Sequence, residues 1–81
     1  METREEILEA MIKRLAELLK TDEGGLGEET EFADLGMKSV NYSQLTTYLE
    51  DECDVEIPYM DFKRKKTLGE AAEYIVSLIE E

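Results

Sequence analysis

The sequence contains no histidine, no tryptophan, a single cysteine and a single proline. Without histidine, the side chain most often used as a general base and as a metal ligand is missing. The lone Cys53 has no histidine to activate it as a nucleophile and no second cysteine for an intramolecular disulfide. These absences predict that the chain has no catalytic residues and no metal site, and that it is not an enzyme.

Positive charge is also scarce. Nine Lys and Arg residues stand against twenty-one Asp and Glu residues, which gives a net charge of −12. Such a chain repels the phosphate backbone of nucleic acids, so we expect protein partners with basic surfaces and no nucleic-acid partner.

Long apolar runs are absent as well. None approaches the ~20 residues needed to span a membrane, and the first ten residues, METREEILEA, are too acidic for a secretory signal. We expect a cytoplasmic protein without membrane contact. The 42% of hydrophobic residues fall in periodic runs, which favour a packed core over disorder. A length of 81 residues predicts one small domain, residues 1–81, and we expect it to be a monomer.

Two amphipathic patterns lie at the ends of the chain. Apolar residues at steps of three and four predict a helix over about residues 3–20, and the same spacing predicts a last helix from residue 68 to the C-terminus. Thr3 with Glu6, and Thr67 with Glu70, form capping-box patterns that can satisfy the free amides at the two helix starts.

The middle of the chain predicts a long loop and two further helices. The stretch TDEGGLGEETEF has three glycines and no helical stripe, so we expect a loop, with Phe32 and Leu35 anchoring its end in the core. Val40, Leu45, Leu49 and Cys53 fit one face of a helix over about residues 39–53, bordered by Tyr42 and Tyr48; Pro58 ends it, and a short helical turn follows over residues 59–64. The expected fold is all-α, a small bundle of three longer helices and one short helix.

Ser39 lies where the loop becomes a helix, and two interpretations compete. Its hydroxyl can accept a backbone hydrogen bond as an N-terminal helix cap, which is the ordinary role of a serine at a helix start. That interpretation leaves no special purpose for the Leu35-Gly36 turn before it or for the Phe32 anchor. The local sequence leaves both a cap and a functional hydroxyl open.

The chain around Ser39 resembles the acyl carrier proteins. Their pattern has a phenylalanine, then Leu-Gly often preceded by Asp, one variable residue, Asp-Ser-Leu, and a Glu-Leu pair further along the helix. The corresponding residues here are Phe32, Asp34, Leu35, Gly36, Met37, Lys38, Ser39 and Val40, with Gln44 and Leu45 at the Glu-Leu pair. The resemblance continues through Glu56, Ile57 and Pro58 and then through Thr67, Leu68, Ala71, Ala72, Tyr74 and Ile75. The first helix matches by pattern only.

This resemblance implies that a phosphopantetheinyl transferase attaches 4′-phosphopantetheine to Ser39, and that the group carries an acyl chain as a thioester to acyl-transferring and synthase enzymes. The transferase supplies the catalysis and Mg²⁺, so a chain without histidine can serve acyl chemistry. The resemblance places partner recognition at Lys38, Val40, Gln44 and Thr47. It places an acyl-chain pocket at Leu45, Leu49, Ile57, Phe62, Ala71 and Tyr74, although these residues also fit an ordinary core. Fatty acid, polyketide and amino acid cargoes all remain open.

The charge pattern departs from that of the family. Lys38 replaces the usual aspartate, Gln44 replaces a glutamate, and residues 39–49 carry no charge. An acidic cluster falls instead at the end of this helix, and a basic run follows the short helix: Glu50, Asp51, Glu52, Asp54 and Glu56, then Lys63, Arg64, Lys65 and Lys66. The basic run is either a solvated stretch with weak ion pairs or, with Lys38, a docking surface remodelled for dedicated partners of a specialised carrier.

Three other interpretations remain to be tested. A carrier-shaped interaction module would leave Ser39 unmodified as a helix cap, and Lys38 favours it. A calcium loop starting at Asp22 has Gly27 at its sixth position, but Ala33 stands where a bidentate glutamate is required. Cys53 fits a buried core position better than a reactive thiol.

Overall fold

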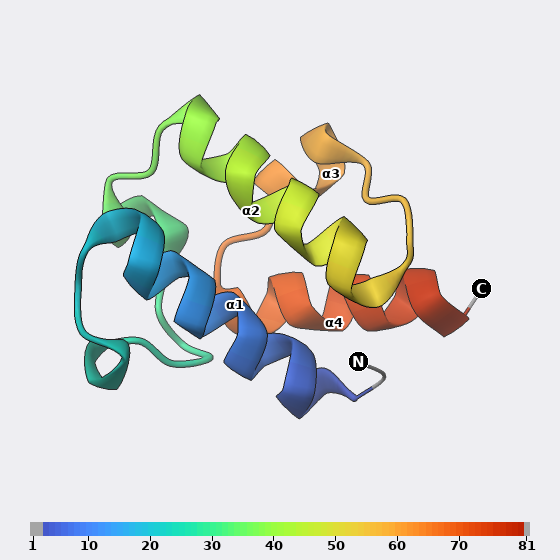
Figure 1. Cartoon of the computed structure of the whole chain (residues 1–81), viewed down its shortest axis with the longest axis horizontal. Helices are drawn as coiled ribbons and strands as arrows, with labels where there is room; N and C mark the ends of the chain where they lie inside the picture. The colour runs from blue at the N-terminus through green and yellow to red at the C-terminus, as the bar shows by residue number, and fades with distance from the viewer. Residues whose placement is uncertain (1–2, 81) are drawn as a thin grey trace.

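The computed structural model describes residues 3–80, which form a bundle of α-helices. The helices of this part of the chain are α1 (Arg4–Leu19), α2 (Ser39–Cys53), α3 (Tyr59–Lys63) and α4 (Leu68–Glu80), with two 3-10 turns, η1 (Glu23–Gly25) and η2 (Phe32–Leu35). In Figure 1, α1 and α2 lie along each other with opposite chain directions, α4 crosses the lower part of the view, and α3 lies beside α2 at the upper right. The prediction of three longer helices and one short helix is confirmed.

The helix ends follow the sequence signals. The amide of Glu6 donates to Thr3 Oγ1 at 3.2 Å, and the amide of Glu70 donates to Thr67 Oγ1 at 3.1 Å, so both predicted caps form. The residues that follow α1 and α2, Lys20 and Asp54, adopt left-handed backbone conformations with φ of 55° and 51° and cap the two helices. Local chemistry therefore fixes the starts of α1 and α4 and the ends of α1 and α2.

One hydrophobic core joins all four helices and the end of the loop. Its buried members are Ile7, Met11, Leu15, Phe32, Tyr42, Leu45, Leu49, Ile57, Phe62, Leu68, Ala71, Ala72 and Ile75. The apolar stripes of α1 and α4 face each other there, as the periodicity predicts. Val40 departs from the expected stripe of α2, because 57% of its surface is exposed. It lies at the first turn of α2, ahead of the point where that helix meets the core.

The loop between α1 and α2 is fastened to the start of α4. The amides of Phe32, Leu68 and Gly69 donate to the carbonyls of Lys66, Thr30 and Glu28 at 2.9, 3.0 and 2.9 Å. An isolated antiparallel bridge pairs Glu31 with Thr67. The loop is thus more structured than a glycine-rich stretch predicts, and it includes the helical turn η1.

Arg4 adds a second attachment between the loop and the helices. Its guanidinium lies 2.9 Å from the Glu28 carboxylate in the loop and 3.4 Å from the Glu73 carboxylate on α4. Gly69 packs so closely beneath it that an added Cβ would lie 2.7 Å from Arg4 Nη2. This side of the molecule holds three chain segments together.

Candidate functional site

The junction before α2 is a tight turn anchored in the core. Phe32 is buried, and its ring centroid lies 5.5 Å from that of Tyr42 and 5.9 Å from that of Phe62. Leu35 is partly buried against the same core. Gly36 then takes a left-handed conformation with φ of 62°, which a side chain would strain. The expected anchoring by Phe32 and Leu35 is confirmed, and it fixes where α2 starts.

Ser39 is the first residue of α2 and is exposed to solvent. The cap position belongs to Lys38, whose amide donates to Asn41 Oδ1 at 3.0 Å. No backbone amide in residues 3–80 donates to the Ser39 hydroxyl. The interpretation of Ser39 as a helix cap is therefore wrong. Lys38 occupies the cap position, and the side-chain oxygen that accepts the hydrogen bond of the cap residue's amide belongs to Asn41. The hydroxyl remains accessible at the helix start.

The backbone around Ser39 fits an attached phosphate. The amides of Asn41 and Tyr42 both donate to the carbonyl of Lys38, at 2.9 and 3.1 Å, whereas the Ser39 and Val40 amides precede the first intrahelical bond. Such amides, together with the positive end of the helix dipole, stabilise an anion. The ammonium of the adjacent Lys38 adds a positive charge. The donors therefore suit the phosphodiester through which 4′-phosphopantetheine is linked to a serine.

Helix α3 also contacts the start of α2. The Tyr59 hydroxyl donates to the Ser39 carbonyl at 3.4 Å. Lys63 Nζ lies 5.9 Å from the ring centroids of both Tyr42 and Tyr59, at the outer limit of a cation-π contact. The sequence signal for α3 is weak, and these contacts could not be inferred from it, because they depend on how α3 packs beside α2.

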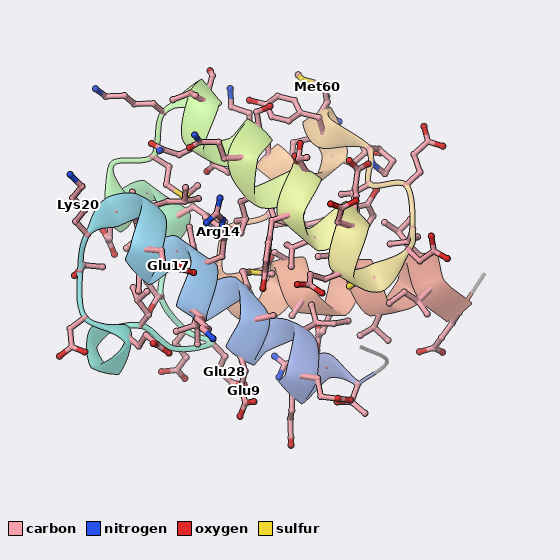
Figure 2. The ribbon with its side chains drawn as sticks, in the orientation of Figure 1. Glu9, Arg14, Glu17, Lys20, Glu28 and Met60 are labelled. Carbon is pink, nitrogen blue, oxygen red and sulfur yellow. The ribbon has the colours of Figure 1, made fainter. Side chains whose placement is uncertain are left out.

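The residues expected to recognise partners all lie on the surface of α2 or at its start. Lys38, Val40, Gln44 and Thr47 are exposed. The last three line a shallow groove of about 400 Å³ that Ser43, Tyr48, Asp51 and Arg14 complete. Figure 2 shows Arg14 on the side of α1 that faces α2, and its guanidinium carbon lies 5.4 Å from the Tyr48 ring centroid. Sequence reasoning missed Arg14, since only tertiary packing brings it to this groove.

The residues expected to form an acyl pocket lie inside the bundle. Leu45, Leu49, Ile57, Phe62 and Ala71 are buried, and Tyr74 packs against them from the edge. The Tyr74 hydroxyl lies 3.5 Å from Asp61 Oδ2. The groove beside α2 includes none of these six residues, and they are continuous with the rest of the core.

The basic and acidic clusters do not pair with each other. Within residues 3–80, the ion pairs of Arg4 do not involve the basic run, and the weak ion pairs expected of that run are absent there. Lys65 Nζ instead lies 4.6 Å from the ring centroid of Tyr74. On the acidic side, the Glu50 carboxylate accepts a hydrogen bond from the Ile57 amide at 2.8 Å. The negative charge of Glu50, near the end of α2, is therefore stabilised by a backbone amide and not by a lysine.

The remaining candidates have structural roles. The Asp22 carboxylate accepts a hydrogen bond from the Gly24 amide at 3.1 Å, as the cap of η1. Residues 3–80 contain no group of three His, Cys, Asp or Glu side chains placed to hold a metal ion. Cys53 packs against the core, and burial raises the pKa of its thiol, which suits a core position. In the same residues, every helix is too short or too polar to cross a membrane.

Comparisons with known proteins agree with this geometry. The family described as "Phosphopantetheine attachment site" matches residues 9–75. The acyl carrier protein of Lactobacillus johnsonii is 34% identical over 76 residues, which are 93% of this chain and 95% of that protein. The chain therefore belongs to the family of phosphopantetheine-binding carrier proteins, which are not themselves enzymes, and 4′-phosphopantetheine is the cofactor of this family.

Solved structures show the same fold. The NMR structure of the HMG-ACPI domain from the CurA module of Lyngbya majuscula has a TM-score of 0.81 and 26% identity, over 98% of this chain and 80% of that one. The crystal structure of a free-standing peptidyl carrier protein from an uncharacterized secondary metabolic pathway of Acinetobacter baumannii has a TM-score of 0.84 and 18% identity, over 95% and 96% of the two chains. The latter likeness concerns the fold alone.

Proposed function

We propose that Ser39 is the attachment point of 4′-phosphopantetheine and that the chain carries acyl groups between the enzymes of fatty acid, polyketide or related acyl biosynthesis. One observation carries the assignment of the residue: an exposed serine begins α2, its hydroxyl accepts no hydrogen bond from a backbone amide of the described residues 3–80, and two amides that precede the helical ladder lie beside it. When bound, the group supplies the terminal thiol on which the cargo forms a thioester.

Other serines fit this role less well. Ser77, on α4, donates its hydroxyl to the Tyr74 carbonyl at 2.6 Å. Ser43 is exposed but lies one turn inside α2, where the backbone amides already bond within the helix. Only a serine at the helix start combines an accessible hydroxyl with free amides and the positive dipole end.

The similarity to an acyl carrier protein supports an acyl cargo. We propose that Lys38, Val40, Gln44 and Thr47 contact the phosphopantetheinyl transferase and the acyl-transferring enzymes. We also propose that the apolar tail of the cargo inserts among Leu45, Leu49, Ile57, Phe62, Ala71 and Tyr74. These side chains are closely packed, so insertion requires the helices around Phe62 to separate. The carrier itself acts as a monomer.

The attachment is tested by the intact mass of the protein after incubation with coenzyme A, Mg²⁺ and a broad-specificity phosphopantetheinyl transferase. We expect the mass to rise by one phosphopantetheine, the Ser39→Ala variant to gain nothing, and the Ser43→Ala variant to react like the parent. Thermal unfolding confirms that both variants are folded. Addition that survives Ser39→Ala would overturn the assignment, and no addition to any variant would indicate an unmodified interaction module.

A further inference from the structure

The positive charges of this acidic chain fall in two separate groups. Four of the nine cations lie on α1 or at its end, namely Arg4, Lys13, Arg14 and Lys20. The other five are Lys38, beside Ser39, and the run Lys63, Arg64, Lys65 and Lys66. Residues 21–62 include no other Lys or Arg than Lys38. Within the second group, Lys38 and Lys63 are far apart in the sequence. The fold places both of them near Ser39.

Lys63 lies beside two tyrosines near the Ser39 end of the molecule, because α3 packs against α2. Its ammonium lies over the rings of Tyr42 and Tyr59. Tyr42 is one turn after Lys38 on α2, and the Tyr59 hydroxyl contacts the Ser39 carbonyl. Ser39 therefore has Lys38 beside it in the chain and Lys63 near it across the α2–α3 contact.

Neither lysine has a carboxylate partner in the part of the chain that the structure describes. Among residues 3–80, no carboxylate lies within ion-pair distance of Lys38 or Lys63, although the chain has twenty-one acidic residues. The two tyrosine rings lie 5.9 Å from the Lys63 ammonium, at the outer limit of a cation-π contact, and they do not cancel its charge. An exposed cation that is left unpaired on so acidic a protein can meet carboxylates from another molecule.

Apolar surface accompanies the two lysines. Val40 and Met60 are the large hydrophobic residues exposed most in residues 3–80, at 57% and 61%. Val40 follows Ser39 directly, and Met60 follows Tyr59; Figure 2 shows Met60 pointing away from the bundle. The acid next to it, Asp61, lies at hydrogen-bond distance from Tyr74. An apolar centre with a charged rim is the usual composition of a specific protein interface.

We propose that Lys38, Lys63, Val40 and Met60 form a docking surface for an enzyme whose contacting face is acidic around an apolar centre. This deepens the proposed function and rests on it, because the surface surrounds the residue on which cargo would be presented. It reverses the preference that the net charge of −12 predicts. The overall charge repels an acidic partner at long range, whereas the local pair of lysines selects it at contact. Added salt should therefore weaken both the long-range repulsion between the two proteins and the attraction between the lysines and the partner's carboxylates.

A direct test uses hexaglutamate as the probe and backbone-amide NMR of the unmodified protein at low salt. We expect shifts at residues 38–42 and 59–63, and we expect them to disappear in the Lys38→Glu/Lys63→Glu variant. Lys13→Glu is the matched control, because Lys13 is an exposed cation on α1. Equal shifts around Lys13 and Lys63, or no shifts at all, would overturn the proposal. Lys63→Gln separates the loss of charge from repulsion by the new carboxylate.

A kinetic test exchanges charges across the interface. The rate of phosphopantetheine addition is measured with a transferase and with a variant of it whose basic carrier-facing residues are changed to glutamate. The parent chain should react faster with the acidic variant, and Lys38→Glu/Lys63→Glu should reverse the order, each by about tenfold. The same ranking for both chains would overturn the proposal.

Self-association is the competing occupant of this surface. The acidic cluster at the end of α2, which includes Glu50 and Glu56, could meet Lys38 and Lys63 of a second copy. Size-exclusion chromatography at low salt would then show oligomers that dissociate in Lys38→Glu/Lys63→Glu, and this result would overturn the proposal of an enzyme partner. Failure of phosphopantetheine attachment would be a separate result, because the hexaglutamate test does not require Ser39 to be modified.

Discussion

Two regions of the molecule use charge in opposite ways. Where α1, the long loop and α4 meet, Arg4 pairs with Glu28 and Glu73, and Gly69 lies directly beneath the guanidinium. Where α2 starts, Lys38 and Lys63 have no carboxylate partner within residues 3–80. In the first region, the charged groups pair with one another and hold three segments of the chain together. The second region leaves its charged groups available to other molecules, next to the proposed attachment residue.

The difference also appears in the hydrophobic residues. Leu68 and Ala72, close to the first region, are fully buried, whereas Val40 and Met60 at the second are more than half exposed. Burial of apolar surface stabilises the fold by roughly 25 cal/mol per Å², so exposed apolar side chains contribute little to it. A carrier must be stable and must also bind several enzymes in turn, and under the proposed docking surface these two requirements fall on different parts of the molecule.

The largest expected effect distinguishes the two faces of α3. Phe62 is 0% exposed and Met60 is 61% exposed on the same short helix. Phe62→Ala should lower the free energy of unfolding by about 3–5 kcal/mol, which is enough to unfold most molecules of a domain of this size. Met60→Ala should change the free energy of unfolding by less than about 0.5 kcal/mol. Urea unfolding measures both. Equal losses in the two variants would show that Met60 belongs to the core and not to a docking surface.

A smaller effect is expected at the α4 start. An added Cβ at Gly69 would lie 2.7 Å from Arg4 Nη2 and 2.9 Å from the Glu28 carbonyl oxygen, which accepts the Gly69 amide. The Arg4 side chain can move away, but the Glu28 carbonyl cannot move without losing its hydrogen bond from the residue 69 amide. Gly69→Ala should therefore lower the free energy of unfolding by about 1–3 kcal/mol. Gly25→Ala is the matched control, since nothing lies within 4 Å of its added Cβ. Unchanged stability of Gly69→Ala would mean that the loop attachment is loose.

The smallest effect concerns alkaline pH. Burial raises the pKa of Tyr42 above its ordinary value near 10, and the nearby Tyr59 adds to the shift. The folded state therefore holds the tyrosine proton more tightly than the unfolded state, and the stabilisation is complete below the unfolded pKa and declines as pH rises above it. Tyr42→Phe should weaken this decline in unfolding experiments between about pH 9 and 11. An identical decline in the parent and in Tyr42→Phe would show that Tyr42 does not contribute to the loss of stability at alkaline pH.

Much of the fold could be predicted from local patterns. The caps at Thr3 and Thr67 and the apolar stripes of α1 and α4 depend on residues three or four apart, so the sequence order already contains them. The carrier family could also be identified, because the pattern from Phe32 to Val40 occurs together with the Glu-Ile-Pro segment, the length, the helix order and the charge of a carrier. Val40 was harder to place, since helical spacing alone assigned an exposed residue to the core stripe.

The cap of α2 could not be assigned correctly from residue type. Serine is a good capping residue and lysine is a poor one, yet Lys38 occupies the position and Asn41 supplies the oxygen. The left-handed Gly36 and the burial of Phe32 determine where the chain enters the helix. A preference of about 1 kcal/mol for one capping residue is outweighed by the anchoring of the preceding turn.

The sequence by itself determined the helices, the acidic character and the presence of a serine at the start of α2, because each depends on neighbouring residues or on simple counting. Only the tertiary structure decided that Arg4 joins three segments, that Arg14 reaches the groove of α2, and that Lys63 lies near Ser39. These contacts join residues that are far apart in the chain. Their geometry follows from how the apolar stripes pack against one another, and no local pattern specifies that packing.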